Sequence, residues 1–398
     1  MTADGLCSSP SSHEPPVEVA LLRGVGGYLS SSVRQFADAL EEGFRRRGDV
    51  TITPIEQAEL GLAARGLPAG MASRWAAGME NVVDSFVRYP LSIRRTRRIR
   101  PFQAYHIIDQ WYAHLVASLP GERTVVSCQD LIMAKYPELP TRFRLPIRDR
   151  LRFALSVRTM NRAARVVCSS RATLEDLVRI CQVDPERIRI VPKGVDARMG
   201  PAAAVEAPVA RPGGNSSHTI LHVSSGWPYK NVAATIRVVA ALRARDVDVT
   251  LVRSGVVLTR DERALAERLR VLPWILDRGW VSDAELVRLY QTADVLLFPS
   301  IYEGFGRPPL EAMACGTPVV VSTAPALLEL VADAGLHADP NDVRRLADAV
   351  ERVLVEPALA AELRARGLQR AAQYSWRRTV AAYAEIYREV IDAAQVRA

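Results

Sequence analysis

Two glutamates stand eight residues apart in the segment 299–321, which reads PSIYEGFGRPPLEAMACGTPVVV. The apolar run 295–298 before it predicts a buried strand, so Glu303 follows a strand's carboxyl end, where open α/β sheets bind ligands. The Pro-Pro pair at 308–309 suits the first turn of a helix that carries Glu311. Nearby glycines let backbone N–H groups approach a ligand, and a helix N-terminus favours an anion. Two carboxylates there suit hydrogen bonds to sugar hydroxyls; the alternative is a loop acid and a solvated helix residue.

Apolar runs of strand length alternate with helical patterns along the chain, which is typical of a parallel α/β sheet. The run at 17–22 is followed by a glycine turn and a helical pattern from Ser30 to Arg47, which is how a Rossmann-like unit opens. The further runs are 105–108, 124–127, 166–168 and 188–191, then 219–223, 249–252, 295–298 and 318–321. Helices are expected to start near Asn231, Asp283, Pro308 and Pro325.

The segment 299–321 resembles the donor-site signature of retaining GT-B glycosyltransferases of family four (glycosyl transferases group 1), roughly P-S-x-x-E-G-F-G-x-P-x-x-E-A-M-A-x-G-x-P-V-V. The resemblance implies an α/β protein of GT-B architecture, with two Rossmann-like domains facing across a cleft. It implies that Glu303 meets hydroxyls of the donor sugar and that Glu311 binds the ribose of the nucleotide. The intervening residues Gly304, Phe305 and Gly306 would offer backbone N–H groups to the sugar and the diphosphate.

The same resemblance extends to the domain plan. A stretch rich in Ala, Pro and Gly without periodicity separates the two series of strands and reads as a linker. We therefore expect a flexible tail, an acceptor-side Rossmann-like domain, a linker, a donor-binding Rossmann-like domain and a C-terminal helix that crosses back to the first domain. Their respective ranges are 1–16, 17–200, 201–218, 219–375 and 376–398.

A lysine at a strand-to-helix turn is the expected cation of the donor site. The sequence from 224 to 231 reads SSGWPYKN, and in the resembling family the lysine of this turn, here Lys230, neutralises the donor diphosphate. A fixed cation there stabilises the negative charge that develops on the leaving group. Many relatives carry an arginine just before this lysine, where this chain has Tyr229. Arg253, after the next strand, is the candidate for the second cation.

Three features of the first half are expected to line the site. Gly26 and Gly27 resemble the family's N-terminal glycine loop beside the donor phosphates, although a glycine turn also serves simply as a tight turn. His106 and His114 are candidate acceptor-site groups, with packed or exposed histidines as the alternative. Gln129 stands where relatives commonly have a histidine near the donor sugar. Glutamine cannot exchange a proton but can hydrogen-bond a hydroxyl.

Composition excludes several other classes of protein. The five cysteines are scattered without a C-x-x-C pair, so neither a disulfide framework nor a zinc site is expected, and a cytoplasmic protein is predicted. No apolar run reaches the roughly 20 residues of a membrane span, and no signal peptide is recognised.

Residues 1–196 hold 28 Lys/Arg against 21 Asp/Glu, while residues 197–398 hold 24 against 23. The basic stretches 86–100 and 141–165 are candidates for peripheral contact with an anionic inner membrane face or for holding a phosphorylated acceptor, with a solvated arginine-rich surface as the alternative. Nucleic-acid binding is less expected, because no recognised module accompanies the charge.

The sequence therefore predicts a retaining glycosyltransferase that moves a sugar from a nucleoside-diphosphate sugar to an acceptor hydroxyl of a natural product or an envelope glycan or lipid. The resemblance implies no metal and no cofactor other than this donor. Retaining transfer in the family is thought to need no protein base, because the acceptor can lose its proton to the departing phosphate. Two alternatives stay open: a non-catalytic GT-B protein that binds the nucleotide sugar or serves as a partner subunit, and a GT-B sugar-nucleotide epimerase.

Overall fold

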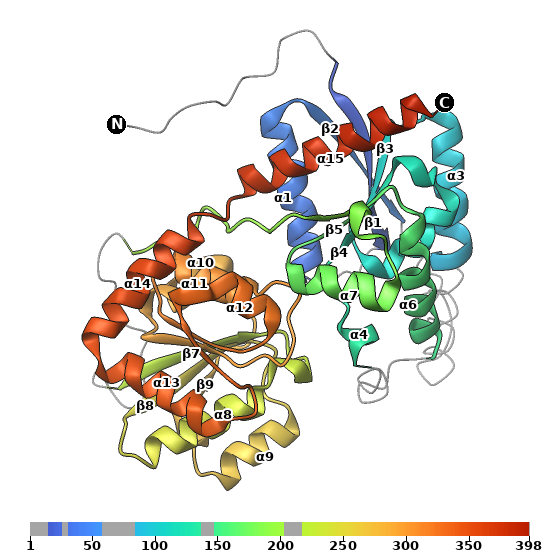
Figure 1. Cartoon of the computed structure of the whole chain (residues 1–398). Helices are drawn as coiled ribbons and strands as arrows, with labels where there is room; N and C mark the ends of the chain where they lie inside the picture. The colour runs from blue at the N-terminus through green and yellow to red at the C-terminus, as the bar shows by residue number, and fades with distance from the viewer. Residues whose placement is uncertain (1–14, 26–30, 58–83, 137–146, 203–216, 398) are drawn as a thin grey trace, which may run out of the picture. The chain divides into compact units, whose positions relative to one another are not determined.

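A computed structural model of the chain describes residues 15–25, 31–57, 84–136, 147–202 and 217–397 (Figure 1). Its contacts divide the chain into two compact units. The first comprises the residues up to Ser169, Leu174–Val191 and Trp376 onward, and the second comprises Ser170–Thr173 and Pro192–Ser375. Residues 192–200 thus group with the second unit, where Val195 N–H donates to Tyr374 O at 3.2 Å.

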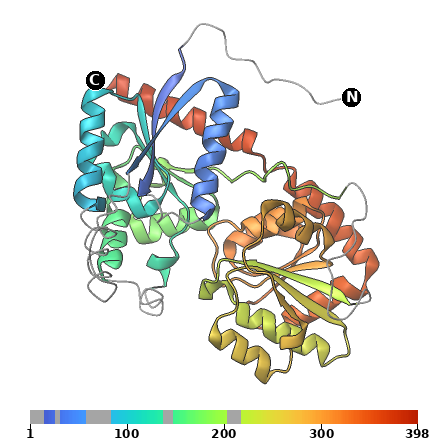
Figure 2. The same ribbon diagram turned by 180° about the vertical axis from the view of Figure 1, so that it is seen from behind.

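The first unit is built on a six-stranded parallel sheet of order β2-β1-β3-β4-β5-β6. The strands are β1 Val17–Val25, β2 Val50–Gln57, β3 Ala104–Ile107, β4 Thr124–Cys128, β5 Arg165–Cys168 and β6 Ile188–Ile190. One face of the sheet is covered by α1 (Ser31–Arg47) and by the C-terminal α15 (Trp376–Val396), which contact each other (Figures 1 and 2). Aromatic residues Phe36, Phe44 and Tyr387 fill the interior between these helices and the sheet.

The remaining helical segments of the first unit complete its α/β architecture. The turn η2 (Gln110–Ser118) contacts both α3 and α6. The segments are η1 Asp84–Arg88, α3 Tyr89–Ile99, η2, η3 Gly121–Arg123, α4 Ile132–Lys135, α6 Ile147–Thr159, η4 Met160–Arg162, α7 Arg171–Cys181 and η5 Pro185–Arg187. Tyr89 and Ile93 form the buried side of α3, one helical turn apart.

The second unit repeats the plan with a parallel sheet of order β12-β11-β10-β7-β8-β9. Its strands are β7 His218–Ser224, β8 Val249–Gly255, β9 Ile275–Asp277, β10 Val295–Phe298, β11 Val319–Ser322 and β12 Leu336–Ala338. Alternate residues of β10 enter different cores, because successive side chains of a strand point to opposite faces. Val295 and Leu297 pack under one set of helices, and Leu296 and Phe298 pack under the other.

Two layers of helices cover these faces (Figure 1). One core takes residues of α8 (Val232–Arg243), α9 (Arg260–Arg268), α13 (Val343–Val355) and α14 (Pro357–Ala371). The other takes residues of α10 (Asp283–Thr292), α11 (Arg307–Ala314) and α12 (Pro325–Val331). Single turns η6 Pro228–Lys230, η7 Leu272–Trp274 and η8 Ala332–Ala334 complete the unit. None of the helices in the described part of the chain has the length and apolarity to cross a membrane.

The expected α/β class with two Rossmann-like units is confirmed, and every predicted strand is present within a few residues. Strands β2, β9 and β12 are not among those predicted from the sequence. All three are edge strands, and β9 and β12 are only three residues long. Short edge strands are half exposed and lack the continuous apolar run of a central parallel strand, so they leave little signal.

Candidate donor site

A fixed corner joins β10 to α11 in the second unit. Gly306 precedes the helix with φ of 106°, a left-handed conformation that favours glycine. A Cβ on Gly306 would lie 2.5 Å from Leu327 Cδ2, so space as well as backbone conformation excludes a side chain there. Phe305 is buried and packs edge-on against Tyr374 at 5.9 Å between ring centroids. The corner therefore presents the start of α11 in one defined position, as the glycine and proline pattern predicts.

Lys230 and Glu303 meet in a buried ion pair. Lys230 follows β7 and Glu303 follows β10, and these strands are parallel neighbours, so their carboxyl ends bring the two side chains together. Lys230 Nζ lies 2.6 Å from Glu303 Oε1, with side-chain exposures of 11% and 9%. The ammonium also lies over the rings of Tyr229 and Phe298, at 5.0 and 5.1 Å from their centroids. The sequence placed both charges in one site, and the structure brings them into direct contact.

The loops that carry this pair are tied to each other through the backbone. Ile301 N–H donates to Tyr229 O at 2.7 Å, and Asn231 adopts a left-handed conformation that turns the chain into α8. The Asn231 amide donates to Pro340 O at 2.7 Å, which fixes the other side of the turn. Tyr229, where relatives often have arginine, thus supplies an aromatic face beside Lys230 rather than a second positive charge.

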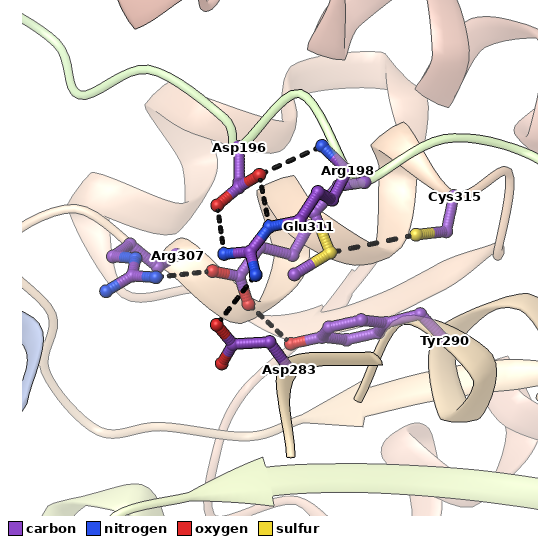
Figure 3. A network of polar contacts seen from close by, with 8 residues as sticks. Asp196, Arg198, Asp283, Tyr290, Arg307, Glu311 and Cys315 are labelled. Atoms are coloured by element: carbon purple, nitrogen blue, oxygen red, sulfur yellow. Dashed lines mark hydrogen bonds and ion pairs between the residues drawn. The ribbon is translucent and has the colours of Figure 1, made fainter. Parts of the chain in front are cut away.

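Glu311 lies on α11 with both carboxylate oxygens engaged (Figure 3). Tyr290 Oη donates to Oε2 at 2.8 Å, and Arg307 Nη2 donates to Oε1 at 2.8 Å. Tyr290 comes from α10 and is fully buried, and burial followed by the neighbouring Glu311 charge raises its pKa well above the usual range. Neither partner of Glu311 was predicted from the sequence. Arg307 had a detectable signal, the i,i+4 spacing of an ion pair on a helix, whereas Tyr290 is 21 residues away.

Charged residues from the segment before β7 form a separate set of contacts near Glu311 (Figure 3). Arg198 holds Asp196 through its backbone N–H at 2.9 Å and through two side-chain hydrogen bonds at 3.0 and 2.6 Å, and it pairs with Asp283 at the start of α10 at 2.9 Å. Hydrogen bonding to Arg198 lowers the pKa of Asp196, and the Arg307 charge contributes to the same shift. Arg307 is therefore close enough to act on two carboxylates, Glu311 and Asp196.

Arg253, the candidate for the second donor-site cation, is buried and paired within the second unit. Its side chain is 1% exposed and pairs with Asp277 at 3.1 Å, and it donates to Val256 O at 3.2 Å. Burial lowers its pKa despite the Asp277 charge. The guanidinium is thus engaged with Asp277 of β9, and its contact with the donor stays a prediction. Arg253 lies within β8 rather than after it, and it stands directly opposite Asp277 of β9 in the strand register.

Gln129 makes hydrogen bonds within the first unit that leave its side-chain carbonyl oxygen unused. Its Nε2 donates to Ile108 O at 2.9 Å, and its backbone N–H donates to Gln110 Oε1 at 2.8 Å. Because Ile108 O can only accept, the amide orientation is defined. The buried Oε1 of Gln129 has no hydrogen-bond partner among the described residues. A fixed, unpaired carbonyl is a suitable acceptor for a hydroxyl of a ligand.

The two histidines named as acceptor groups are packed within the first unit. His106 is fully buried, with Nδ1 at 2.7 Å from Tyr387 Oη and Nε2 at 2.8 Å from Ser127 Oγ, and burial lowers its pKa to about 3. His114 is 6% exposed, with Nδ1 at 3.0 Å from Ser156 Oγ. These contacts favour the packed-histidine alternative for both. Gly26 and Gly27 lie outside the described residues.

No group of three or more His, Cys, Asp or Glu side chains placed to hold a metal ion occurs among the residues that the structure describes. The four described cysteines are all buried, namely Cys128, Cys168, Cys181 and Cys315.

Comparisons with known proteins match both units. Residues 42–198 match the family model described as Glycosyltransferase Family 4, and residues 212–370 match the model described as Glycosyl transferases group 1. O-antigen chain mannosyltransferase B from Escherichia coli is 46% identical over 112 residues, 28% of this chain and 29% of that protein. D-inositol 3-phosphate glycosyltransferase from Salinispora arenicola is 28% identical over 93% of this chain and 88% of its own length. The chain thus aligns with under a third of the first relative and with most of the second.

A solved structure shares the fold over nearly the whole chain. Sucrose-phosphate synthase from Thermosynechococcus elongatus superposes with a TM-score of 0.73 at 19% identity, covering 95% of this chain and 100% of that one. At this identity the likeness concerns the fold alone.

Proposed function

We propose, because this chain belongs to the glycosyl transferases group 1 family, that it transfers a sugar from a nucleoside-diphosphate sugar to an acceptor hydroxyl. The observation that carries the proposal is the buried Lys230–Glu303 pair at the carboxyl ends of β7 and β10, with Glu311 on the next helix. A cation for phosphate and two acids for hydroxyls match the three parts of such a donor. Mannose is a donor sugar to test, because one relative is named as a mannosyltransferase.

Each side chain has a role in this proposal. Lys230 moves from Glu303 toward the diphosphate and pairs with its negative charge, which grows as the bond to the sugar breaks. Glu303 accepts hydrogen bonds from the donor sugar, and Glu311 accepts them from the ribose. Backbone N–H groups of Gly304, Phe305 and Gly306, and the N-terminus of α11, add positive potential at the phosphates.

The stereochemistry and the absence of a metal are part of the proposal. We infer retention of the anomeric configuration, with the acceptor hydroxyl giving its proton to the departing phosphate on the same face. Lys230 and the α11 N-terminus would supply the positive charge that a metal supplies in other transferases. Gln129 Oε1 would then position a sugar or acceptor hydroxyl rather than exchange a proton. Gly26 and Gly27 keep the phosphate-side role that the resemblance implies.

A thermal-shift panel of uridine, guanosine and adenosine diphosphates and their sugars tests the donor site. A ligand at a hundredfold excess over its dissociation constant stabilises the native state by about 2.7 kcal/mol. Lys230→Ala and Glu311→Ala should abolish the shift, whereas Arg260→Ala, an exposed residue on the same unit, should not. A panel without any shift contradicts the proposal.

Product analysis separates the remaining alternatives. Release of nucleoside diphosphate from the donor that gives a shift supports a transferase, and NMR of the anomeric carbon in the product reports retention. A shift without release would identify a binding or partner protein. Conversion of the nucleotide sugar into its epimer without release would identify an epimerase. Chelation should leave a metal-independent transferase fully active.

We also propose that the first unit docks on an anionic membrane face. Large apolar side chains project from the outer faces of α3 and α6, with exposures of 56% for Leu91, 75% for Ile99, 65% for Leu151 and 45% for Leu155. Exposed arginines that pair with no carboxylate of the described residues accompany them, namely Arg94, Arg95, Arg98, Arg150, Arg158 and Arg162. Each arginine near such a surface contributes about 1 kcal/mol to binding.

A further inference from the structure

Tyr290 and Arg307 hold the Glu311 carboxylate from two sides (Figure 3). Tyr290 Oη reaches Oε2 from α10, and Arg307 Nη2 reaches Oε1 from the first residue of α11, each at 2.8 Å. Both donors address the same carboxylate but different oxygens, so together they fix its plane as well as its place. One hydrogen bond alone would leave the carboxylate free to rotate about its last torsion.

The Glu311 carboxylate keeps an unused lone pair on each of its two oxygens. An ionised carboxylate accepts about four hydrogen bonds, two at each oxygen. Tyr290 and Arg307 use one at each oxygen, which leaves one at each. Two parallel acceptors on a rigid carboxylate match two hydroxyls on adjacent carbons, the vicinal diol of a ribose. A single hydroxyl would use only half of this arrangement.

We propose that Tyr290 and Arg307 are positioning residues that set Glu311 as a two-point acceptor for the ribose 2′- and 3′-hydroxyls. The inference rests on the proposed donor site. It predicts that this site prefers ribonucleotides to 2′-deoxyribonucleotides. Neither residue needs to touch the donor, since each acts through the carboxylate it holds.

The surroundings of the two donors differ, which makes them separable by mutation. Tyr290 is fully buried, and its backbone carbonyl accepts from Thr317 Oγ1, so the ring is locked in the core beside α11. Arg307 is 29% exposed on its side chain and lies on the solvent side of the carboxylate. Substitution of Arg307 therefore disturbs packing little, while Tyr290→Phe removes one oxygen and leaves the ring in place.

The experiment compares the dissociation constants of ribonucleoside diphosphates with those of their 2′-deoxy forms. Calorimetry is run on the wild type, Tyr290→Phe, Arg307→Met, Arg307→Lys and Glu311→Gln, with the base that gives the largest shift. We expect the preference for ribose to fall by at least about threefold in Tyr290→Phe and Arg307→Met, since each frees one oxygen of the carboxylate. The 2′-deoxy form should weaken less than the ribo form, because only its 3′-hydroxyl can bind Glu311, and Arg307→Lys should recover part of the preference.

The outcomes distinguish this inference from the proposed function. A wild type that binds no nucleoside diphosphate contradicts the proposed donor site. A wild type that prefers ribose, with variants that keep the same preference, contradicts the positioning role alone. Equal weakening of ribo and deoxy forms also overturns it, because that pattern indicates a structural or phosphate effect. If Tyr290→Phe unfolds, the more exposed Arg307 variants decide the question by themselves.

Discussion

The strongest stability prediction concerns Lys230→Met. The substitution keeps a long side chain against the rings of Tyr229 and Phe298 but removes the charge 2.6 Å from Glu303 Oε1. Two unit charges about 4 Å apart interact by about 4 kcal/mol at an effective dielectric constant near 20. Removing one partner of a buried pair costs about 3–5 kcal/mol, because the other charge stays buried without compensation. We therefore expect a loss of about 3 kcal/mol.

Differential scanning calorimetry measures this loss in the absence of donor. For a folding unit of this size, about 3 kcal/mol corresponds to a fall in Tm of roughly 10 °C. Lys135→Met is the matched control, because Asp176 loses one ion pair there but keeps a second with Arg179 at 3.0 Å. The control should cost about 1 kcal/mol.

A double-mutant cycle then tests the physical reason. Lys230→Met/Glu303→Leu removes both charges, so most of the stability lost in Lys230→Met should return, because no buried charge is left uncompensated. A double variant whose loss equals the sum of the single losses would show that the two side chains are not coupled. That result would refute the buried ion pair and, with it, the assignment of Lys230 as a cation available to the donor diphosphate.

Two further predictions concern the first unit. Complete burial lowers the His106 pKa to about 3, while an unfolded histidine titrates near 6.5, so protons bind the unfolded state first as pH falls and stability is lost between about pH 6.5 and 3. His106→Gln should therefore reduce the stability difference between pH 8 and pH 5 by about 2 kcal/mol in urea unfolding, and an unchanged difference would contradict the burial argument. Arg95→Gln/Arg98→Gln should weaken binding to phosphatidylglycerol vesicles about thirtyfold in sedimentation assays, whereas Arg260→Gln/Arg268→Gln on α9 should not. Equal effects of the two pairs, or equal binding to phosphatidylcholine vesicles, would refute docking through α3.

Local rules made part of the site predictable. A strand, a glycine corner and a Pro-Pro helix start place Glu303 and the first turn of α11 by neighbouring residues alone. Parallel strands put their carboxyl ends at one edge, which is why Lys230 and Glu303 could be assigned to the same site although 73 residues separate them. The family motif then supplied the chemistry of the ligand.

The sequence by itself determined the α/β class and the two series of strands, and it named the acids and the cation that we propose for the donor site. Only the tertiary structure decided which polar side chains contact each other. Arg253 pairs with Asp277, and Tyr290 donates a hydrogen bond to Glu311. His106 contacts Tyr387, which lies 281 residues away in the sequence. Strand and helix patterns arise from contacts within a few residues, whereas the partner of a buried polar group is set by which distant segments fold against it.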